Sequence, residues 1–284
     1  FGFINNYLQM ERKMAETGTI SVSAENIFPI IKKALYSEHD IFLRELISNA
    51  ADAITKHGRL VLMGDSTHKD VVPEIRIIAD EAAKTLTIRD NGLGMSGAEV
   101  KKYINEVAFS SANDFAKLFT DKNDQNRIIG HFGLGFYSAF MVASQVEIKT
   151  KSYRPEEKAV KWFCDGSIEF TLEEIDKQEL GTEIVLHIDK DSKEFLNNYT
   201  LKETVKKYCR FFPYKIFVGD EQVNVDNPIF ARTASDVKED EYKAFYKELY
   251  PFEKEPLFWI HLNFDVPVPI RGVLFFPQKT RFEA

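Results

Sequence analysis

Three polar residues recur at helical spacing near the start of the chain. Glu45, Asn49 and Asp52 stand at positions i, i+4 and i+7, so on a helix they form one polar face. Lys56 follows one turn later. Together these side chains offer a general base, a metal ligand and a cation for phosphate. Apolar residues would occupy the opposite, core-facing side: Leu43, Ile47, Ala50 and Ile54. The pattern suits a magnesium nucleotide, although most polar helix faces are only solvated surface.

Three glycine-containing segments follow at intervals along the chain. The alternating run 85–89 predicts a strand that leads into the sequence DNGLGM at 90–95. The sequence GHFGLGF at 130–136 precedes an apolar helix candidate at 137–142, and glycines before a helix let backbone N–H groups approach phosphate oxygens. Gly181 and Thr182 then open a predicted strand at 183–188. Each segment alone is an ordinary turn signal, but their order and spacing are specific.

The polar helix face with Glu45, Asn49 and Asp52 and the three glycine-containing segments together resemble the four motifs of the Bergerat-fold ATPases. This superfamily contains gyrase B, the MutL repair proteins, sensor histidine kinases and the ninety-kilodalton heat-shock (Hsp90) chaperones. The chain is most similar to the chaperones, at 19–56 (including DIFLRELISNA at 40–50) and at 132–140 (FGLGFYSAF). The resemblance extends from about Thr17 to the last residue. The polar junction at 225–240 is short, whereas eukaryotic cytosolic members of the family carry a long charged insertion there. In this respect the chain resembles the bacterial or organellar branch of the family.

Composition narrows the functional class. The 284 residues are 44% hydrophobic and 29% charged, which is typical of a soluble globular chain of more than one domain. A formal net charge of −7 provides no basic surface for nucleic acid. Cys164 and Cys209 are too few for a disulfide framework or a zinc site, so we expect a reducing, cytoplasmic-type compartment and no metal beyond magnesium. No apolar run reaches the roughly 20 residues that span a membrane.

The expected fold is α+β, a two-layer sandwich of helices on a mostly antiparallel sheet of the eight-stranded type, followed by the beginning of a second α/β domain. Residues 1–16 are expected to be an extension or added sequence outside the fold. The resemblance implies an ATP-binding domain at 17–224 with a lid at about 105–130, a short linker at 225–240, and the truncated start of a middle domain at 241–284.

Periodicity and capping signals predict the individual elements. Ser37 is a candidate N-cap for a helix that Gly58 would end after His57, and Ser96 and Glu99 form a capping box. A hairpin is expected to end at Asp90. The other expected helices are 25–35, 137–142, 201–211 and 241–250, and the other expected strands are 19–22, 146–150, 160–164, 167–172, 183–188, 257–265 and 272–276.

The resemblance also implies a role for each candidate site residue. Asp90 would accept a hydrogen bond from the adenine amine, Asn49 would bind Mg²⁺, and Glu45 would be the general base for water attacking the γ-phosphate. Residues expected to contact the base are Leu93, Gly94, Met95 and Thr182. Residues expected beside the phosphates and the rest of the nucleotide are Asp52, Ala53, Lys56, Asn105, Gly130, Gly133, Leu134, Gly135 and Phe136.

The implied activity is that of an ATP-dependent chaperone that binds Mg-ATP or Mg-ADP and acts on unfolded or metastable client proteins. The whole protein would be a homodimer held by a carboxyl-terminal domain, with neither nucleic acid nor membrane as a partner. In the family an arginine from the middle domain reaches the γ-phosphate from beyond residue 284, so this chain is expected to hydrolyse ATP weakly. The alternative is the ATPase module of a type II topoisomerase or a MutL-type repair protein, which usually carries a basic DNA-facing surface.

Overall fold

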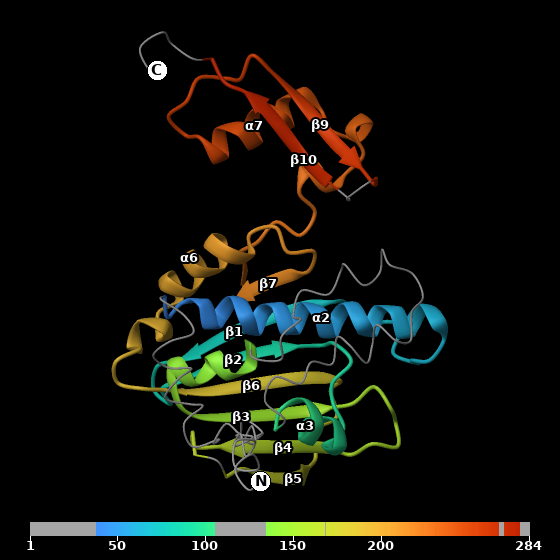
Figure 1. Ribbon diagram of the computed structural model, residues 1–284, viewed down its shortest axis with the longest axis vertical. Coiled ribbons are helices and arrows are strands. Elements are labelled where there is room, and N and C mark those ends of the chain that lie inside the picture. Colours follow the sequence, from blue (N-terminus) through green and yellow to red (C-terminus); the bar gives the residue numbers. More distant parts are fainter. Residues whose placement is uncertain (1–37, 106–134, 168, 267–269, 279–284) are drawn as a thin grey trace, which may run out of the picture.

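The computed structural model describes residues 38–105, 135–167, 169–266 and 270–278, and these form two sheets with their helices (Figure 1). The larger sheet has eight strands in the order β5-β4-β3-β6-β2-β1-β7-β8. Every neighbouring pair is antiparallel except β1 and β7. The predicted mostly antiparallel eight-stranded sheet is therefore confirmed. Its strands are β1 (Glu74–Asp80), β2 (Thr85–Asp90), β3 (Ala143–Lys151), β4 (Ala159–Cys164), β5 (Thr171–Ile175), β6 (Gly181–Ile188), β7 (Lys215–Val218) and β8 (Glu221–Gln222).

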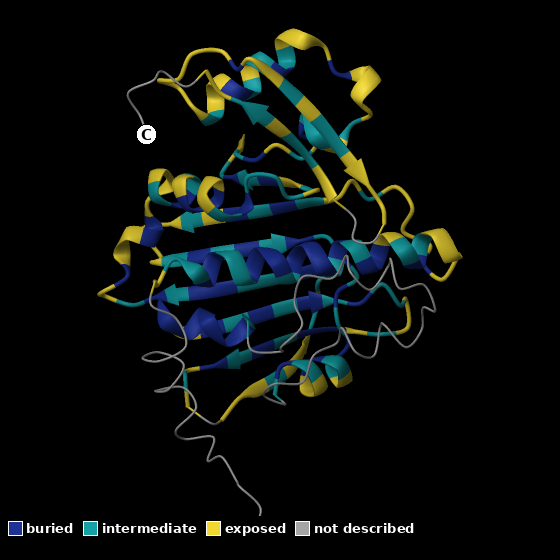
Figure 2. Ribbon diagram, turned by 45° about the horizontal axis from the view of Figure 1, so that its top comes forward, coloured by how far each residue is buried: buried dark blue, intermediate teal, exposed yellow. Residues whose placement is uncertain are grey.

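Helix α2 (Ile41–Met63) lies across one face of this sheet. Its apolar side is fully buried, and so are alternate residues of β1 and β2 such as Ile77 and Leu86. Figure 2 shows this buried layer running along α2 and the central strands. The remaining helical elements here are α3 (Gly97–Tyr103), α6 (Asn198–Cys209), and the 3₁₀ turns η2 (Gly135–Met141) and η3 (Lys193–Leu196). No helix in the described part of the chain is long and apolar enough to cross a membrane.

Both predicted ends of α2 were wrong. The helix continues through Gly58 to Met63, because Leu60 adds another buried residue to the apolar side. Gly64, in the left-handed conformation at φ 85°, ends it instead. At the other end Asp40, rather than Ser37, occupies the N-cap position. Ser37 itself, the expected strand 19–22 and the expected helix 25–35 lie outside the described residues.

The other predictions differ in how well they match the structure. The hairpin ending at Asp90 and the capping box of Ser96 and Glu99 are confirmed. The strand expected at 167–172 begins only at Thr171, because a turn at Gly166, with φ 82°, comes first. The helix expected at 137–142 is the 3₁₀ turn η2. Strands β7 and β8 were not predicted, since runs of four and two residues give little periodic signal.

The carboxyl-terminal elements form a second, two-stranded sheet. Strands β9 (Phe258–Phe264) and β10 (Ile270–Phe276) pair in antiparallel register beside α7 (Glu239–Leu249). Tyr242 of α7 stacks on Trp259 at 5.1 Å and bonds His261 through its hydroxyl at 2.6 Å. The 3₁₀ turns η4 (Ile229–Ala231) and η5 (Ala234–Asp236) precede α7. The domain boundaries given above stay predictions, although the helix and both strands expected after residue 240 are present.

Gly94 fixes the turn after β2 against the neighbouring strand. Its φ is 62°, and a Cβ atom there would lie 1.9 Å from the carbonyl oxygen of Lys151. Gly219 has almost the same φ, 61°, but no atom lies within 4 Å of the corresponding Cβ position. A side chain at Gly219 would therefore meet backbone strain alone, whereas a side chain at Gly94 would meet the same strain and a steric clash.

We expect Gly219→Ala to lower the free energy of unfolding by about 1 kcal/mol, because only a left-handed conformation is strained. Gly94→Ala should cost about 3 kcal/mol, because the backbone of Lys151 must also move. Urea unfolding of both variants measures the difference. Equal losses would contradict the close approach of the two segments.

Candidate functional site

The polar face of α2 meets the first residue of η2. The Glu45 side chain is 19% exposed, Asn49 is half-buried and Asp52 is buried. A Cβ atom at Gly135 would lie 2.8 Å from Oε2 of Glu45 and 3.7 Å from Nδ2 of Asn49. Glycine therefore lets the start of η2 approach both polar groups closely, where a side chain would collide with Glu45. The structure thus brings Glu45 and Asn49 together with Gly135, which follows them by nearly ninety positions.

Arg44 forms an ion pair with Glu45. Its Nε donates a hydrogen bond to Oε1 at 3.1 Å, and its Nη2 donates to the same oxygen. The pair engages Oε1 and fixes the orientation of the carboxylate. Arg44 was missed as a site residue, since neighbours in sequence do not normally face each other on a helix. The adjacent opposite charges were the only signal.

Asp90 is buried at the end of β2, with 7% of its surface exposed. The backbone N–H groups of Gly92, at 2.8 Å, and of Thr182 donate hydrogen bonds to its carboxylate. Burial outweighs these bonds and the positive charges of Lys177 and Arg89, and it raises the pKa of Asp90 to about 7. Asp90 is therefore an acceptor whose charge can change near neutral pH.

Two threonines and a backbone amide form a hydrogen-bonded group beside Asp90. Thr182 of β6 pairs with Asp90 on one side and with Thr150 of β3 on the other. The Thr150 and Thr182 hydroxyls lie 3.0 Å apart, and Met95 donates its N–H to the Thr150 hydroxyl at 2.9 Å. Thr150 was also missed; a polar residue continuing the buried alternation of Val146 and Ile148 was the available signal.

The segment 90–95 is held between α2 and β3. The Leu93 N–H donates to the carbonyl of Ala53 at 3.2 Å, and the Tyr153 N–H donates to the carbonyl of Leu93 at 2.9 Å. Leu93 therefore contacts α2 at Ala53, whereas Gly94 and Met95 contact β3 at Lys151 and Thr150. These contacts join two of the predicted site segments, α2 and 90–95, through Ala53 and Leu93.

Two further predicted phosphate contacts are Lys56, on α2, and Asn105, which follows α3. Lys56 is buried, which lowers its pKa, while the charge of Asp52 one turn earlier raises it. Oδ1 of Asn105 accepts a hydrogen bond from Nε1 of Trp162 at 2.9 Å, so its amide nitrogen is the group that would donate to a phosphate. Phe136 is buried beside Trp162, with ring centroids 5.7 Å apart. The predicted residues Gly130, Gly133 and Leu134 lie outside the described residues.

The donor set fits a magnesium ion better than a metal held by protein alone. Within the described ranges, no group of three or more His, Cys, Asp or Glu side chains could hold a metal ion. Asn49, which lies beside Gly135, has a neutral amide oxygen of the kind that Mg²⁺ accepts. Mg²⁺ is commonly bound by one or two protein oxygens together with phosphates and water.

The fold is that of an HSP90-like ATPase domain, and comparison with known proteins agrees. The family model described as "Histidine kinase-, DNA gyrase B-, and HSP90-like ATPase" matches residues 36–195, more than half of the chain. The chain belongs to this family of HSP90-like ATPases. The model described as "Hsp90 protein" matches residues 218–284.

Individual relatives include bacterial chaperone proteins and a mitochondrial protein. The chain is 50% identical over 278 residues to "Chaperone protein HtpG" of Bacteroides thetaiotaomicron, a match that covers 93% of the chain and 40% of that protein. It is 46% identical over 280 residues to the HtpG of Porphyromonas gingivalis, and this match covers 93% of the chain and 41% of that protein. It is 34% identical over 268 residues to the mitochondrial "TNF receptor-associated protein 1 homolog" of Dictyostelium discoideum, and this match covers 94% of the chain and 38% of that protein. The chain thus spans about two fifths of the length of these relatives.

The raised pKa of Asp90 predicts a pH-dependent effect of Asp90→Asn on stability without nucleotide. An unfolded Asp ionises near pH 4, whereas folded Asp90 keeps its proton up to about pH 7. The wild type should therefore lose stability, by at most a few kcal/mol, as the pH rises between these values. The asparagine does not titrate, so the stability of the variant relative to that of the wild type should increase from pH 5 to pH 8. Thermal unfolding at both values tests this, and a constant difference would contradict the burial argument.

Proposed function

We propose that the chain binds Mg-ATP or Mg-ADP along the polar face of α2 and hydrolyses ATP at Glu45. The observation that carries this proposal is the close approach of Gly135 to both Glu45 and Asn49, because it brings the end of the glycine-containing segment next to a candidate base and a candidate metal ligand. Membership of the HSP90-like ATPases supports the same assignment. A DNA-directed ATPase is less favoured, since the bacterial relatives named above are chaperone proteins.

The adenine is recognised at Asp90. Its carboxylate accepts a hydrogen bond from the amine at adenine N6, while the Thr182 hydroxyl bonds the base directly or through water. Met95 packs on the purine with the backbone of Leu93 and Gly94 beside it. A guanine would present a carbonyl to Asp90 in place of the amine, so the site should select adenine.

The phosphates lie toward Gly135 and the amino-terminal half of α2. The amide oxygen of Asn49 binds Mg²⁺, which neutralises phosphate charge when bound. Lys56 and the amide nitrogen of Asn105 donate to phosphate oxygens, and Asp52 and Ala53 contact the nucleotide from α2. Backbone N–H groups of the glycine segment from Gly130 to Phe136 complete the phosphate contacts.

Hydrolysis requires Glu45 to act as a general base. Its carboxylate accepts a proton from a water molecule as the water oxygen bonds to the γ-phosphorus, and the bond from that phosphorus to the β–γ bridging oxygen breaks to leave ADP. Arg44 holds Oε1, so Oε2 is the oxygen that faces Gly135 and the water. The Arg44 pair thus orients the Glu45 carboxylate.

For the whole protein we propose a chaperone cycle driven by this ATPase. Unfolded or metastable client proteins would be its substrates, and a homodimer in a cytoplasmic or organellar compartment its working form. These proposals rest on the relatives, which are more than twice as long as the chain.

The first test is calorimetric titration with Mg-ADP and Mg-GTP. We expect saturable binding of Mg-ADP, binding of Mg-GTP weaker by about tenfold or more because of the lost hydrogen bond, and loss of Mg-ADP binding in Asp90→Asn. The variant should unfold as cooperatively as the wild type, which serves as the control. No binding of Mg-ADP by the folded wild type would overturn the proposed site.

The second test separates binding from hydrolysis at Glu45. Glu45→Gln should retain Mg-ADP affinity within about twofold and lose ATP turnover by about 100-fold, the usual contribution of a general base. A phosphate-release assay measures turnover. Turnover equal to that of the wild type would assign the base to another residue.

A further inference from the structure

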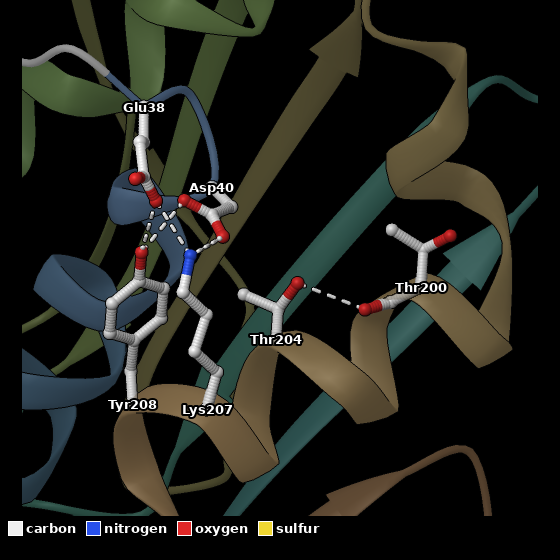
Figure 3. A network of polar contacts seen from close by, with 6 residues as sticks. All are labelled: Glu38, Asp40, Thr200, Thr204, Lys207 and Tyr208. Atoms are coloured by element: carbon white, nitrogen blue, oxygen red, sulfur yellow. Dashed lines mark hydrogen bonds and ion pairs between the residues drawn. The ribbon is translucent and has the colours of Figure 1, made fainter.

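The first turn of α2 is held by the end of α6. Asp40, at the N-cap position, makes no capping bond with its own helix. Nζ of Lys207 donates hydrogen bonds to the carboxylates of Asp40, at 3.0 Å, and Glu38, at 2.6 Å (Figure 3). The Tyr208 hydroxyl lies 3.0 Å from an oxygen of each carboxylate and donates to one of them at a time. The backbone bonds of this turn are long, including Ile41 N–H to the carbonyl of Glu38 at 3.4 Å. The end of α6 therefore supplies polar side-chain contacts to the start of α2.

This contact lies close to the proposed base. Glu45 follows Asp40 by little more than one helical turn. Cys209, the next residue after Tyr208, is buried and lies close enough to Arg44 and Glu45 to respond to both charges. The end of α6 thus contacts α2 over the segment that carries Glu45.

The same end of α6 also contacts the second sheet unit. Arg210 forms an ion pair with Glu248 of α7. Phe211 packs edge-on against Phe230 of η4, with centroids 5.1 Å apart, and against Phe245 of α7 at 5.8 Å. Five consecutive residues, 207–211, therefore connect the start of α2 with α7. We call them the α6 junction.

We propose that Lys207 and Tyr208 are positioning residues for Glu45, and that the α6 junction makes their position depend on α7. The inference rests on the proposed ATPase function for its catalytic part, whereas the physical coupling can be measured without nucleotide. Lys207 and Glu38 are 50% and 60% exposed, so solvent weakens each pair and the junction sets geometry more than overall stability.

Hydrogen exchange of the backbone at residues 41–49 tests the contact in the absence of nucleotide. Lys207→Met and Tyr208→Phe should each increase exchange there by about two- to fivefold, the range expected for partly exposed polar pairs. Lys206→Met is the matched control, because Lys206 pairs with Glu203 inside α6. Unchanged exchange in both junction variants would overturn the inference and leave the proposed function standing.

A test variant and a matched control variant, both in α7, test the dependence on α7. Glu248→Gln removes the partner of Arg210, whereas Glu239→Gln removes a carboxylate of the same helix that pairs with Lys243 inside α7. Only Glu248→Gln should increase exchange at residues 41–49. An equal effect of the two variants, or none, would overturn the coupling to α7.

Turnover distinguishes positioning from a general loss of structure. In Lys207→Met and Tyr208→Phe, ATP turnover should fall about two- to fivefold, in line with the exchange effect, while Mg-ADP affinity stays unchanged. Lys207→Arg, which can still donate to both carboxylates, should restore turnover. Equal losses of affinity and turnover would contradict a positioning role. Failure of the wild type to bind Mg-ADP would instead overturn the proposed function, and the exchange result would still decide the contact.

Discussion

The burial of one side of α2 against the sheet is the constraint on which the rest of the structure depends. Because Leu43, Leu46 and Ile47 are fully buried, the helix cannot rotate without exposing them. Its opposite side, with Glu45 and Asn49, is thereby directed toward η2. The close approach at Gly135 and the placement of 90–95 between α2 and β3 both follow from this fixed rotation. A single amphipathic helix thus provides both the core and the polar groups of the candidate site.

Much of this arrangement could be predicted from sequence, since the relevant patterns are local. The polar face of α2, the β1–β2 hairpin and the capping box at Ser96 depend on neighbours within a few residues. The predicted helix end at Gly58 was wrong because a buried Leu60 outweighed the intrinsic preference of glycine for helix ends. The short strands β7 and β8 were not predicted because sheet pairing, not periodicity, creates them.

The candidate site likewise contains residues that local sequence patterns could group and residues that they could not. Glu45, Asn49 and Asp52 could be grouped because they share a helix, and Asp90 because it ends a strand. Thr150 and Arg44 were missed, since the first reaches Asp90 only through the register of three strands and the second acts through a side-chain conformation. The α6 junction was also beyond sequence reasoning, as Lys207 and Glu38 are separated by most of the ATPase domain.

The burial of Asp90 has a consequence for how ligand binding is coupled to the solvent. A carboxyl group with a pKa near 7 is about half protonated at neutral pH. A ligand that donates a hydrogen bond to this group favours its ionised form, so binding must release a fraction of a proton to the buffer. Heats measured in buffers of different ionisation enthalpy would then differ, and acidification would weaken the complex. The same carboxyl group that selects the base would also make occupancy of the site a function of the surrounding proton concentration.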